Sequence, residues 1–439
     1  MSHELMITNY NNRICACFYE EGRLAELQVI PEEECSDFEK NGNIPMGENN
    51  AKNEQFQISE NSAENDKIQT EKNNAESNRI QIGDIYVGRV QNIVKNLDAA
   101  FIEVAPDIIC YYPLSNYPPI ILNSKKSDRL AIGDEVLVRV SRDAIKQKLP
   151  SVSSDILLTG KLVVVRHGGG GLVGVSKKVP FDEKMQDMKN RLQQYLPEGF
   201  GAILRTNSYE NTFEDVLAEY EGLLDQLTWI LEHAKYHKVF SCLYREQTIW
   251  KRMMDDYNNN SLTKIITDLP YVRDELLKAL PIKDHGKLSF YDAHIQPLYA
   301  MYRLDRDMKE ARNKQVWLKS GAYLVIEQTE AMVVIDVNTG KAVDKKNREE
   351  NFYKVNLEAA AEIARQLRIR NLSGIIIIDF IDMESGEHEK QLLKYLSNEL
   401  KKDRIKVNVI DMTKLKLVEL TRKKVQKSLE EQFVAHNNY

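Results

Sequence analysis

The amino-acid sequence predicts a multidomain protein that combines α/β and all-β domains, and three observations support this fold class. Residues 81–154 contain short alternating strands separated by Gly and Asp, which is typical of a small five-stranded barrel. Residues 312–433 alternate apolar strands with amphipathic helices, the pattern of an α/β domain. Residues 35–80 are rich in Asn, Glu, Lys and Ser and poor in apolar residues, so we expect a disordered insertion there.

Composition and cysteine usage predict a cytoplasmic protein without a membrane span. No apolar run approaches the roughly 20 residues that a transmembrane helix needs. The N-terminal sequence has no basic region followed by an apolar one, so we expect no secretory signal. The five cysteines are scattered and form no CxxC, which favours a reducing compartment and argues against a cysteine-ligated zinc.

The net charge of −6 is concentrated in one part of the chain. Residues 31–80 carry twelve acidic and five basic side chains, so the remaining 55 basic and 54 acidic side chains are almost balanced. The sequence therefore allows a local basic surface for an anionic partner, but the composition does not require one.

Further strands and helices can be placed in chain order. Two or three strands joined by tight turns are predicted near the N-terminus, in "ELMITNY" and "RICACFYEEGRLAELQVI". After the barrel we expect two strands around a glycine-rich loop in "GKLVVVRHGGGGLVGVSKKV", and a strand ending in a polar loop in "FGAILRTNS". A long amphipathic helix is predicted for "TFEDVLAEYEGLLDQLTWILEHA" because of its apolar spacing.

The C-terminal region contains two apolar strands that each lead into a carboxylate. The first, "AMVVIDVNTG", reaches Asp336, and the second, "GIIIIDFIDM", reaches Asp379. Between them, residues 348–374 place apolar side chains three and four positions apart and end at a glycine, which predicts a helix. The four consecutive isoleucines before Asp379 predict a central strand covered on both faces.

Asp336 and Asp379 are candidate ligands of a divalent cation. Side chains at the carboxyl ends of strands in an open α/β sheet point into the crevice where ligands bind. Two carboxylates there repel each other unless a cation lies between them, and Mg²⁺ is commonly held by one or two carboxylates with waters and phosphates. Asn338 is placed to orient the Asp336 carboxylate, and Asp382 is a weaker candidate for the same cluster. The alternative is that these aspartates cap helices or start turns.

Several longer stretches resemble a known family. The catalytic domain of the RNase E/G family of bacterial endoribonucleases closely resembles "TEAMVVIDVNTGKAV" and "NLEAAAEIARQLRIRNLSGIIIIDFIDM". The OB-fold RNA-binding module of the family is similar to "IYVGRVQNIVKNLDAAFIEV", and its sensor for an RNA 5′ end is similar to "LTGKLVVV" with "LRTNS". The resemblance implies an OB-fold barrel and a 5′-sensor inserted into an RNase H-like domain, followed by a DNase I-like catalytic domain. The implied boundaries are 1–34 with 250–311 for the RNase H-like domain, 81–154 for the OB-fold, 155–249 for the 5′-sensor and 312–433 for the catalytic domain.

The resemblance implies a magnesium-dependent endoribonuclease. Asp336 and Asp379 match the two magnesium ligands of the family, and Asn338 matches the residue that holds the first ligand in place. Members cut single-stranded RNA and leave a 5′-phosphate and a 3′-hydroxyl, so the implied partners are rRNA precursors and mRNA, in rRNA maturation and mRNA decay. The alternative is a catalytically silent RNA-binding or ribosome-associated protein of the same fold.

The barrel carries the residues that the resemblance assigns to RNA binding. Phe101 and Tyr111 match positions where the family stacks unpaired bases, which exposed aromatics on such a barrel do without demanding a sequence. The alternative for Phe101, in "AAFIEV", is an ordinary core position. Lys148 falls where the family contacts the RNA backbone, although its surroundings, "IKQKLPSVSSD", depart from the family's usual sequence.

The 5′-sensor would recognise a terminal monophosphate, which is a dianion. A guanidinium fork, a hydroxyl and backbone N–H groups are suited to it, and Arg205 with Thr206 supplies the first two. An ordinary surface loop is the alternative for this pair. Lys177 and Lys178 occupy positions where the family often has arginine, and lysine lacks the fork geometry. The resemblance assigns the sensor to Gly160, Val164, Arg205 and Thr206.

The sequence also departs from the family pattern. The zinc-binding CPxC stretch that usually follows the catalytic domain does not occur in this sequence, which argues against a zinc link between subunits. A homodimer formed by surface packing stays compatible with the sequence. No long disordered scaffold follows the catalytic domain, so the chain resembles the shorter, RNase G-like members.

Overall fold

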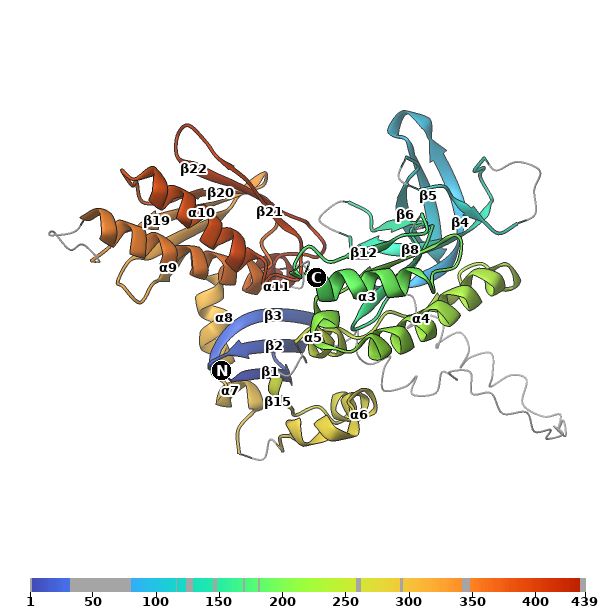
Figure 1. Ribbon diagram of the computed structural model, residues 1–439, viewed down its shortest axis with the longest axis horizontal. Helices are drawn as coiled ribbons and strands as arrows, with labels where there is room; N and C mark the ends of the chain where they lie inside the picture. The colour runs from blue at the N-terminus through green and yellow to red at the C-terminus, as the bar shows by residue number, and fades with distance from the viewer. Residues whose placement is uncertain are drawn as a thin grey trace.

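The computed structural model is a mixed α/β structure with separate β-sheets (Figure 1). Each sheet packs its apolar side chains into a core. The predicted insertion at 35–80 lies outside the described residues, except for Ile80. Across the described ranges, no helix has both the length and the apolar character that a membrane crossing requires. The structure describes residues 2–31, 80–115, 117–123, 129–144, 148–168, 170–180, 182–257, 262–292, 295–341 and 348–434.

The N-terminal strands form a sheet with two strands from far along the chain. The strand order is β16-β15-β1-β2-β3, and β1 pairs in parallel with β15. Side chains of β1 and β2 alternate between two apolar cores, one shared with α5 and α6 and the other with α8, so β2 is buried along nearly its whole length. The elements are β1 (His3–Asn9), β2 (Arg13–Glu20), β3 (Arg23–Pro31), α5 (Ile249–Tyr257), β15 (Leu262–Thr267), α6 (Pro270–Ala279), β16 (Leu288–Phe290) and α8 (Leu304–Arg312).

The predicted five-stranded barrel is present. Five strands pair in the order β4-β5-β6-β9-β8, and a further pairing of β4 with β8 closes the barrel. Gly88 in β4 leaves room for a core side chain of the neighbouring strand, because a Cβ there would lie 2.6 Å from the Ile102 side chain of β5. Short strands extend the sheet at its edges. The elements are β4 (Ile85–Val94), β5 (Ala99–Ala105), β6 (Ile108–Pro113), β8 (Glu135–Arg142) and β9 (Ser151–Ser153), with β7 (Ile120–Ile121) and β14 (Cys242–Tyr244) at the edges.

A four-stranded sheet follows the barrel and is covered by two helices. Its order is β10-β11-β13-β12, and α3 and α4 bury apolar side chains against it. The predicted long helix, α4, begins at a capping box in which Thr212 and Asp215 bond to each other's backbone N–H groups. The elements are β10 (Leu157–Thr159), β11 (Val163–His167), β12 (Val173–Val175), α3 (Glu183–Gln193), β13 (Phe200–Leu204) and α4 (Phe213–His233).

The C-terminal region is a mixed six-stranded sheet with the order β17-β18-β19-β20-β22-β21. Two helices, α9 and α10, share one apolar core with it (Figure 1). The chain leaves α9 through Asn371 and Gly374, which both have positive φ. The elements are β17 (Gln315–Trp317), β18 (Tyr323–Gln328), β19 (Met332–Asn338), α9 (Arg348–Ile369), β20 (Gly374–Asp379), α10 (Gly386–Leu400), β21 (Val407–Met412) and β22 (Leu417–Arg422).

The prediction that the isoleucine strand is covered on both faces is wrong. Ile376 and Ile378 are fully buried against the helices, but Ile375 is 49% exposed. The neighbouring β19 alternates in the same way, with Met332 and Val334 exposed. A continuous apolar run does not distinguish a strand covered on both faces from one that exposes apolar side chains on an open face. This sheet therefore has an open face, which we call the open face of the catalytic sheet, after the role that the sequence resemblance predicts for it.

Candidate active site and RNA-contacting residues

Asp336 in β19 and Asp379 in β20 are direct neighbours. The two strands run parallel, and Asp336 is the register partner of Asp379. Paired residues of adjacent strands project from the same face, and such strands lie about 4.8 Å apart. Both side chains are exposed. The two carboxylates therefore stand side by side on the open face of the catalytic sheet.

The surroundings of this pair orient one carboxylate and hinder ionisation of the other. Asn338, two residues further along β19, donates from its Nδ2 to Oδ2 of Asp336 over 2.7 Å. The pKa of Asp379 is raised, first by partial burial and then by the negative charges of Asp336 and Asp382. Full ionisation of the pair is thus costly unless a cation compensates the charge.

The loop after β20 is held by two residues of α9 that sequence reasoning missed. The buried Asn356 donates to the carbonyl of Ile381 over 2.8 Å and accepts from its N–H over 3.1 Å. The Glu349 carboxylate accepts from the backbone N–H groups of Glu384 at 3.0 Å and Ser385 at 3.1 Å. The sequence did offer a signal for Asn356, because it lies on the apolar face of a predicted helix. A buried Asn needs a hydrogen-bond partner, so its position indicated a specific contact.

The donor set at the open face fits a hard divalent cation that is shared with a phosphate. Within the ranges that the structure describes, no group of three or more His, Cys, Asp or Glu side chains is arranged to hold a metal ion. Mg²⁺ does not need such a group, since it keeps several waters and is often bound by one or two carboxylates plus substrate phosphates. Asp336 and Asp379 supply two neighbouring carboxylates that repel each other, so together they can hold such a cation.

Phe101 and Tyr111 lie opposite each other on the barrel. They are register partners in β5 and β6, and their rings meet edge to face with centroids 6.3 Å apart. Both side chains are partly exposed, whereas Ile102 and Tyr112, the next residues, are buried. The two predicted stacking residues thus form one aromatic surface outside the core. Lys148 is exposed.

The residues predicted for the 5′-sensor meet at one end of β11 and β13. Arg205 follows β13, and its guanidinium donates to the carbonyl of Gly160. Its backbone N–H donates to the Leu162 carbonyl over 2.8 Å. Val164 lies in β11 opposite Ile203, and Thr206 is exposed next to Arg205.

A carboxylate of the chain itself lies beside this group. Glu219 of α4 accepts hydrogen bonds from three consecutive backbone N–H groups, those of Lys161 at 2.7 Å, Leu162 at 2.6 Å and Val163 at 2.9 Å. Gly160 makes room for it, because a Cβ at that position would lie 2.6 Å from the Glu219 carboxyl group. Backbone amides that an anion could use are therefore engaged by Glu219.

The two lysines that were open candidates for the sensor differ in their contacts. Lys178 donates from Nζ to the backbone carbonyl of Asp403, and burial lowers its pKa. Lys177 is exposed. Lys178 thus joins the four-stranded sheet β10-β11-β13-β12, which we call the sensor sheet after its predicted role, to the segment that follows α10.

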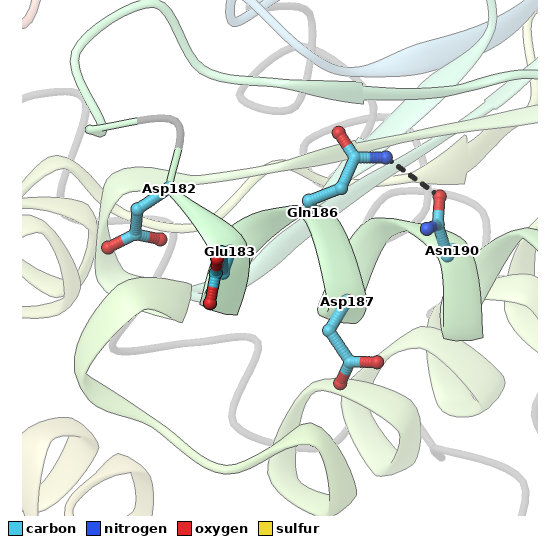
Figure 2. Close-up of a pocket in the computed structure, with 5 residues that line it drawn as sticks. All are labelled: Asp182, Glu183, Gln186, Asp187 and Asn190. Carbon is cyan, nitrogen blue, oxygen red and sulfur yellow. Dashed lines mark hydrogen bonds between the residues drawn. The ribbon is translucent and has the colours of Figure 1, made fainter.

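A surface hollow of about 540 Å³ lies along α3 (Figure 2). Its carboxylates come from Asp182, which caps the helix, and from Glu183 and Asp187. Figure 2 also shows Gln186 donating to Asn190, over 2.9 Å. The negative charge of this hollow disfavours an RNA phosphate, so we do not assign the substrate to it.

Comparison with known proteins gives consistent matches over most of the chain. A sequence profile described as the Ribonuclease E/G family matches residues 157–425. A Ribonuclease G of Salmonella typhimurium is 32% identical over 363 residues, which cover 80% of this chain and 74% of the relative. A Ribonuclease G of Escherichia coli is 33% identical over 365 residues, with the same coverage. A Ribonuclease E of Synechocystis is 32% identical over 362 residues, which cover 80% of this chain and 54% of the relative.

Proposed function

Because the chain belongs to the Ribonuclease E/G family, we propose that it is a magnesium-dependent endoribonuclease that cuts single-stranded RNA to 5′-phosphate and 3′-hydroxyl ends. Family membership confirms the predicted enzyme class. The observation that carries the finer proposal is the register pairing of Asp336 with Asp379 on the open face of the catalytic sheet. Its substrates would be rRNA precursors and mRNA, in rRNA maturation and mRNA decay.

In this proposal the chain's own residues hold and orient the reacting groups. Asp336 and Asp379 would hold the magnesium ion, and Asn338 fixes the rotamer of Asp336 through its 2.7 Å hydrogen bond. When bound, the ion would lower the pKa of a water and neutralise charge on the scissile phosphate. The Asn356 amide fixes the loop that follows Asp379, so the strand end stays in place.

The RNA would extend from the active site over the barrel and the sensor sheet. Phe101 and Tyr111 offer exposed ring surface for stacking unpaired bases. Lys148 would contact the backbone. Arg205 and Thr206, with Gly160 and Val164, would recognise a 5′-monophosphate and make such RNA the preferred substrate.

We also propose the finer fold assignments that follow from the family. The sheet of β1–β3 with β15 and β16 would be the RNase H-like domain, and the six-stranded sheet would be the DNase I-like domain.

The decisive experiment replaces one carboxylate of the pair. The purified Asp336→Asn variant and the unaltered protein are incubated with magnesium and a 5′-monophosphorylated single-stranded RNA, and product ends are mapped. Loss of cleavage with RNA binding retained supports the proposal. Asp411→Asn, on an outer strand of the same sheet, is the matched control and should cleave normally. If the unaltered protein binds RNA without cutting it, the alternative of a catalytically silent RNA-binding protein is correct.

A further inference from the structure

The two carboxylate oxygens of Asp256 are each taken by a different arginine. Asp256 lies in α5, and its side chain is 13% exposed. Its Oδ1 accepts from Nη2 of Arg205 at 2.7 Å, and its Oδ2 accepts from Nη1 of Arg404 at 3.1 Å. Arg205 belongs to the sensor sheet and Arg404 to the catalytic domain. One carboxylate thus joins three parts of the chain, and we call the group of Glu26, Asp256, Arg205 and Arg404 the domain junction.

Arg404 is fixed from two sides. Its Nε donates to Oε1 of Glu26 over 2.8 Å, and Glu26 is almost fully buried in β3. Burial has the largest single effect on the Glu26 carboxyl and raises its pKa, but the charge of Arg404 and the hydrogen bonds from Tyr257 and Arg404 together lower the pKa overall. Arg404 therefore spans the carboxylates of Glu26 and Asp256. Because the guanidinium group is planar and rigid, a movement of one carboxylate would change the contact with the other.

The junction is also linked to the strand that carries Asp379. Asp403, next to Arg404, is bound by Nε of Arg422 at 2.7 Å in a buried ion pair. Arg422 ends β22, and β22 pairs with β20 along its whole length, from Gly374 to Asp379. A continuous series of hydrogen bonds and paired strands thus runs from Arg205 to the strand of Asp379, and such a network can carry energetic coupling between two sites.

On the sensor side, Asp256 orients Arg205 without using all of its donors. The guanidinium group has five N–H donors, and the contacts with Gly160 and Asp256 come from Nη1 and Nη2. The side chain of Arg205 is 24% exposed, so part of it faces solvent. A terminal phosphate that binds Arg205 would compete with the Asp256 carboxylate for the positive charge of the Arg205 guanidinium. Asp256 would then interact more strongly with Arg404.

We propose that Asp256 is a positioning residue that couples the binding of a terminal RNA phosphate at Arg205 to the strand carrying Asp379, through Arg404. This inference depends on the proposed sensor function of Arg205. Coupling of this kind is reciprocal, so RNA engaged at the active site would also bind its terminal phosphate more tightly.

The test measures kcat/KM for one single-stranded RNA carrying either a 5′-monophosphate or a 5′-hydroxyl. The ratio of the two values is compared for the unaltered protein, Asp256→Asn, Arg404→Lys and the double variant. We expect each single variant to lower the ratio about tenfold, within the usual range of coupling between sites. The double variant should lower it no further, because both residues act on the same path. The Arg404→Lys substitution keeps the charge beside Glu26, but the lysine ammonium cannot span both carboxylates.

Using a ratio separates coupling from damage to the fold, because a misfolded fraction lowers both rates equally. Asp274→Asn, on the neighbouring helix α6, removes an exposed carboxylate paired with Arg273 and should leave the ratio unchanged. If Arg404→Lys retains the wild-type ratio, or if the two effects multiply, the coupling proposal is overturned while the sensor stands. A wild-type ratio of one overturns the sensor and the coupling together.

Discussion

Two charged clusters of the molecule are built in opposite ways. On the open face of the catalytic sheet, Asp336 and Asp379 stand next to each other, exposed and of like charge. At the domain junction, Asp256 and Glu26 are largely buried, and Arg404 lies between them. Opposite charges offset the cost of burial at the junction, whereas like charges on the sheet leave a demand for a cation. The charges that join parts of the fold are thus separate from the charges that we propose to act in catalysis.

The largest effect on stability should come from removing Arg404, the junction arginine that contacts both carboxylates. Arg404→Met leaves Glu26 buried without its main counter-charge, which should lower the free energy of unfolding by about 3–5 kcal/mol. Urea denaturation followed by circular dichroism measures the change. Lys402→Met is the matched control, since Lys402 pairs with Glu399 at the surface and such pairs contribute under about 1 kcal/mol. An equal decrease in the free energy of unfolding of both variants would contradict the proposed difference between the two clusters.

The next largest effect is expected for Asn338 on the catalytic sheet, where a substitution should change activity but not stability. Asn338→Ala removes the hydrogen bond that orients Asp336. We expect cleavage and apparent magnesium affinity to fall by about 10–100-fold. The free energy of unfolding should hardly change, because the site is exposed. A magnesium titration of the cleavage rate measures this. Asn408→Ala, an exposed position in β21, should behave as wild type, and a normal titration for Asn338→Ala would argue against its orienting role.

A smaller effect is expected at the aromatic surface of the barrel. Phe101→Ala removes a partly exposed ring, and we expect RNA affinity to fall by about tenfold, near the lower end of measured base-stacking contributions. Fluorescence anisotropy of a labelled single-stranded RNA, without magnesium, measures binding. Phe101→Tyr retains the ring face and should bind normally. Loss of thermal stability without loss of affinity would instead place Phe101 among the structural residues.

The smallest effect tests a carboxylate next to the junction. Burial raises the pKa of Asp255 to about 6, against the lowering influence of Lys251 and Lys161. Since the folded-state pKa lies above the unfolded value, its contribution to stability is complete below the unfolded pKa and is lost as pH rises through about 6. Asp255→Asn should therefore be more stable than wild type at pH 7, by about 1 kcal/mol after allowing for partial exposure. Melting temperatures should converge near pH 4, and a constant difference would contradict the assignment.

The sequence allowed prediction of features whose signals are local. The barrel strands, α4 and α9 follow from residue spacing, and Asp336 and Asp379 stand out because each follows an apolar strand. The prediction that Asp336 and Asp379 lie close together assumed only that their two strands are neighbours in the sheet, which they are. The one-sided cover of β20 was not predictable, because four consecutive isoleucines are compatible with either arrangement.

The domain junction could not have been predicted from spacing. Asp256 lies 51 residues from Arg205 and 148 residues from Arg404 in the sequence. Nothing near any of these residues indicates its partners, because the contacts arise only when separate domains dock. The contact of Glu219 with the amides of 161–163 is of the same kind, since a Glu on an amphipathic helix normally faces solvent.

The pairing of β1 with β15 has a consequence for biosynthesis. Strand β1 pairs with a strand that is synthesised about 260 residues later. The hairpin of β1 and β2 therefore leaves the ribosome with one unpaired edge. At roughly 5–20 residues per second, translation takes on the order of tens of seconds to supply Leu262–Thr267. Meanwhile the barrel and the sensor sheet, which lie between these strands in the sequence, can fold. We expect the six-stranded sheet of residues 315–422 to dock after these parts have folded.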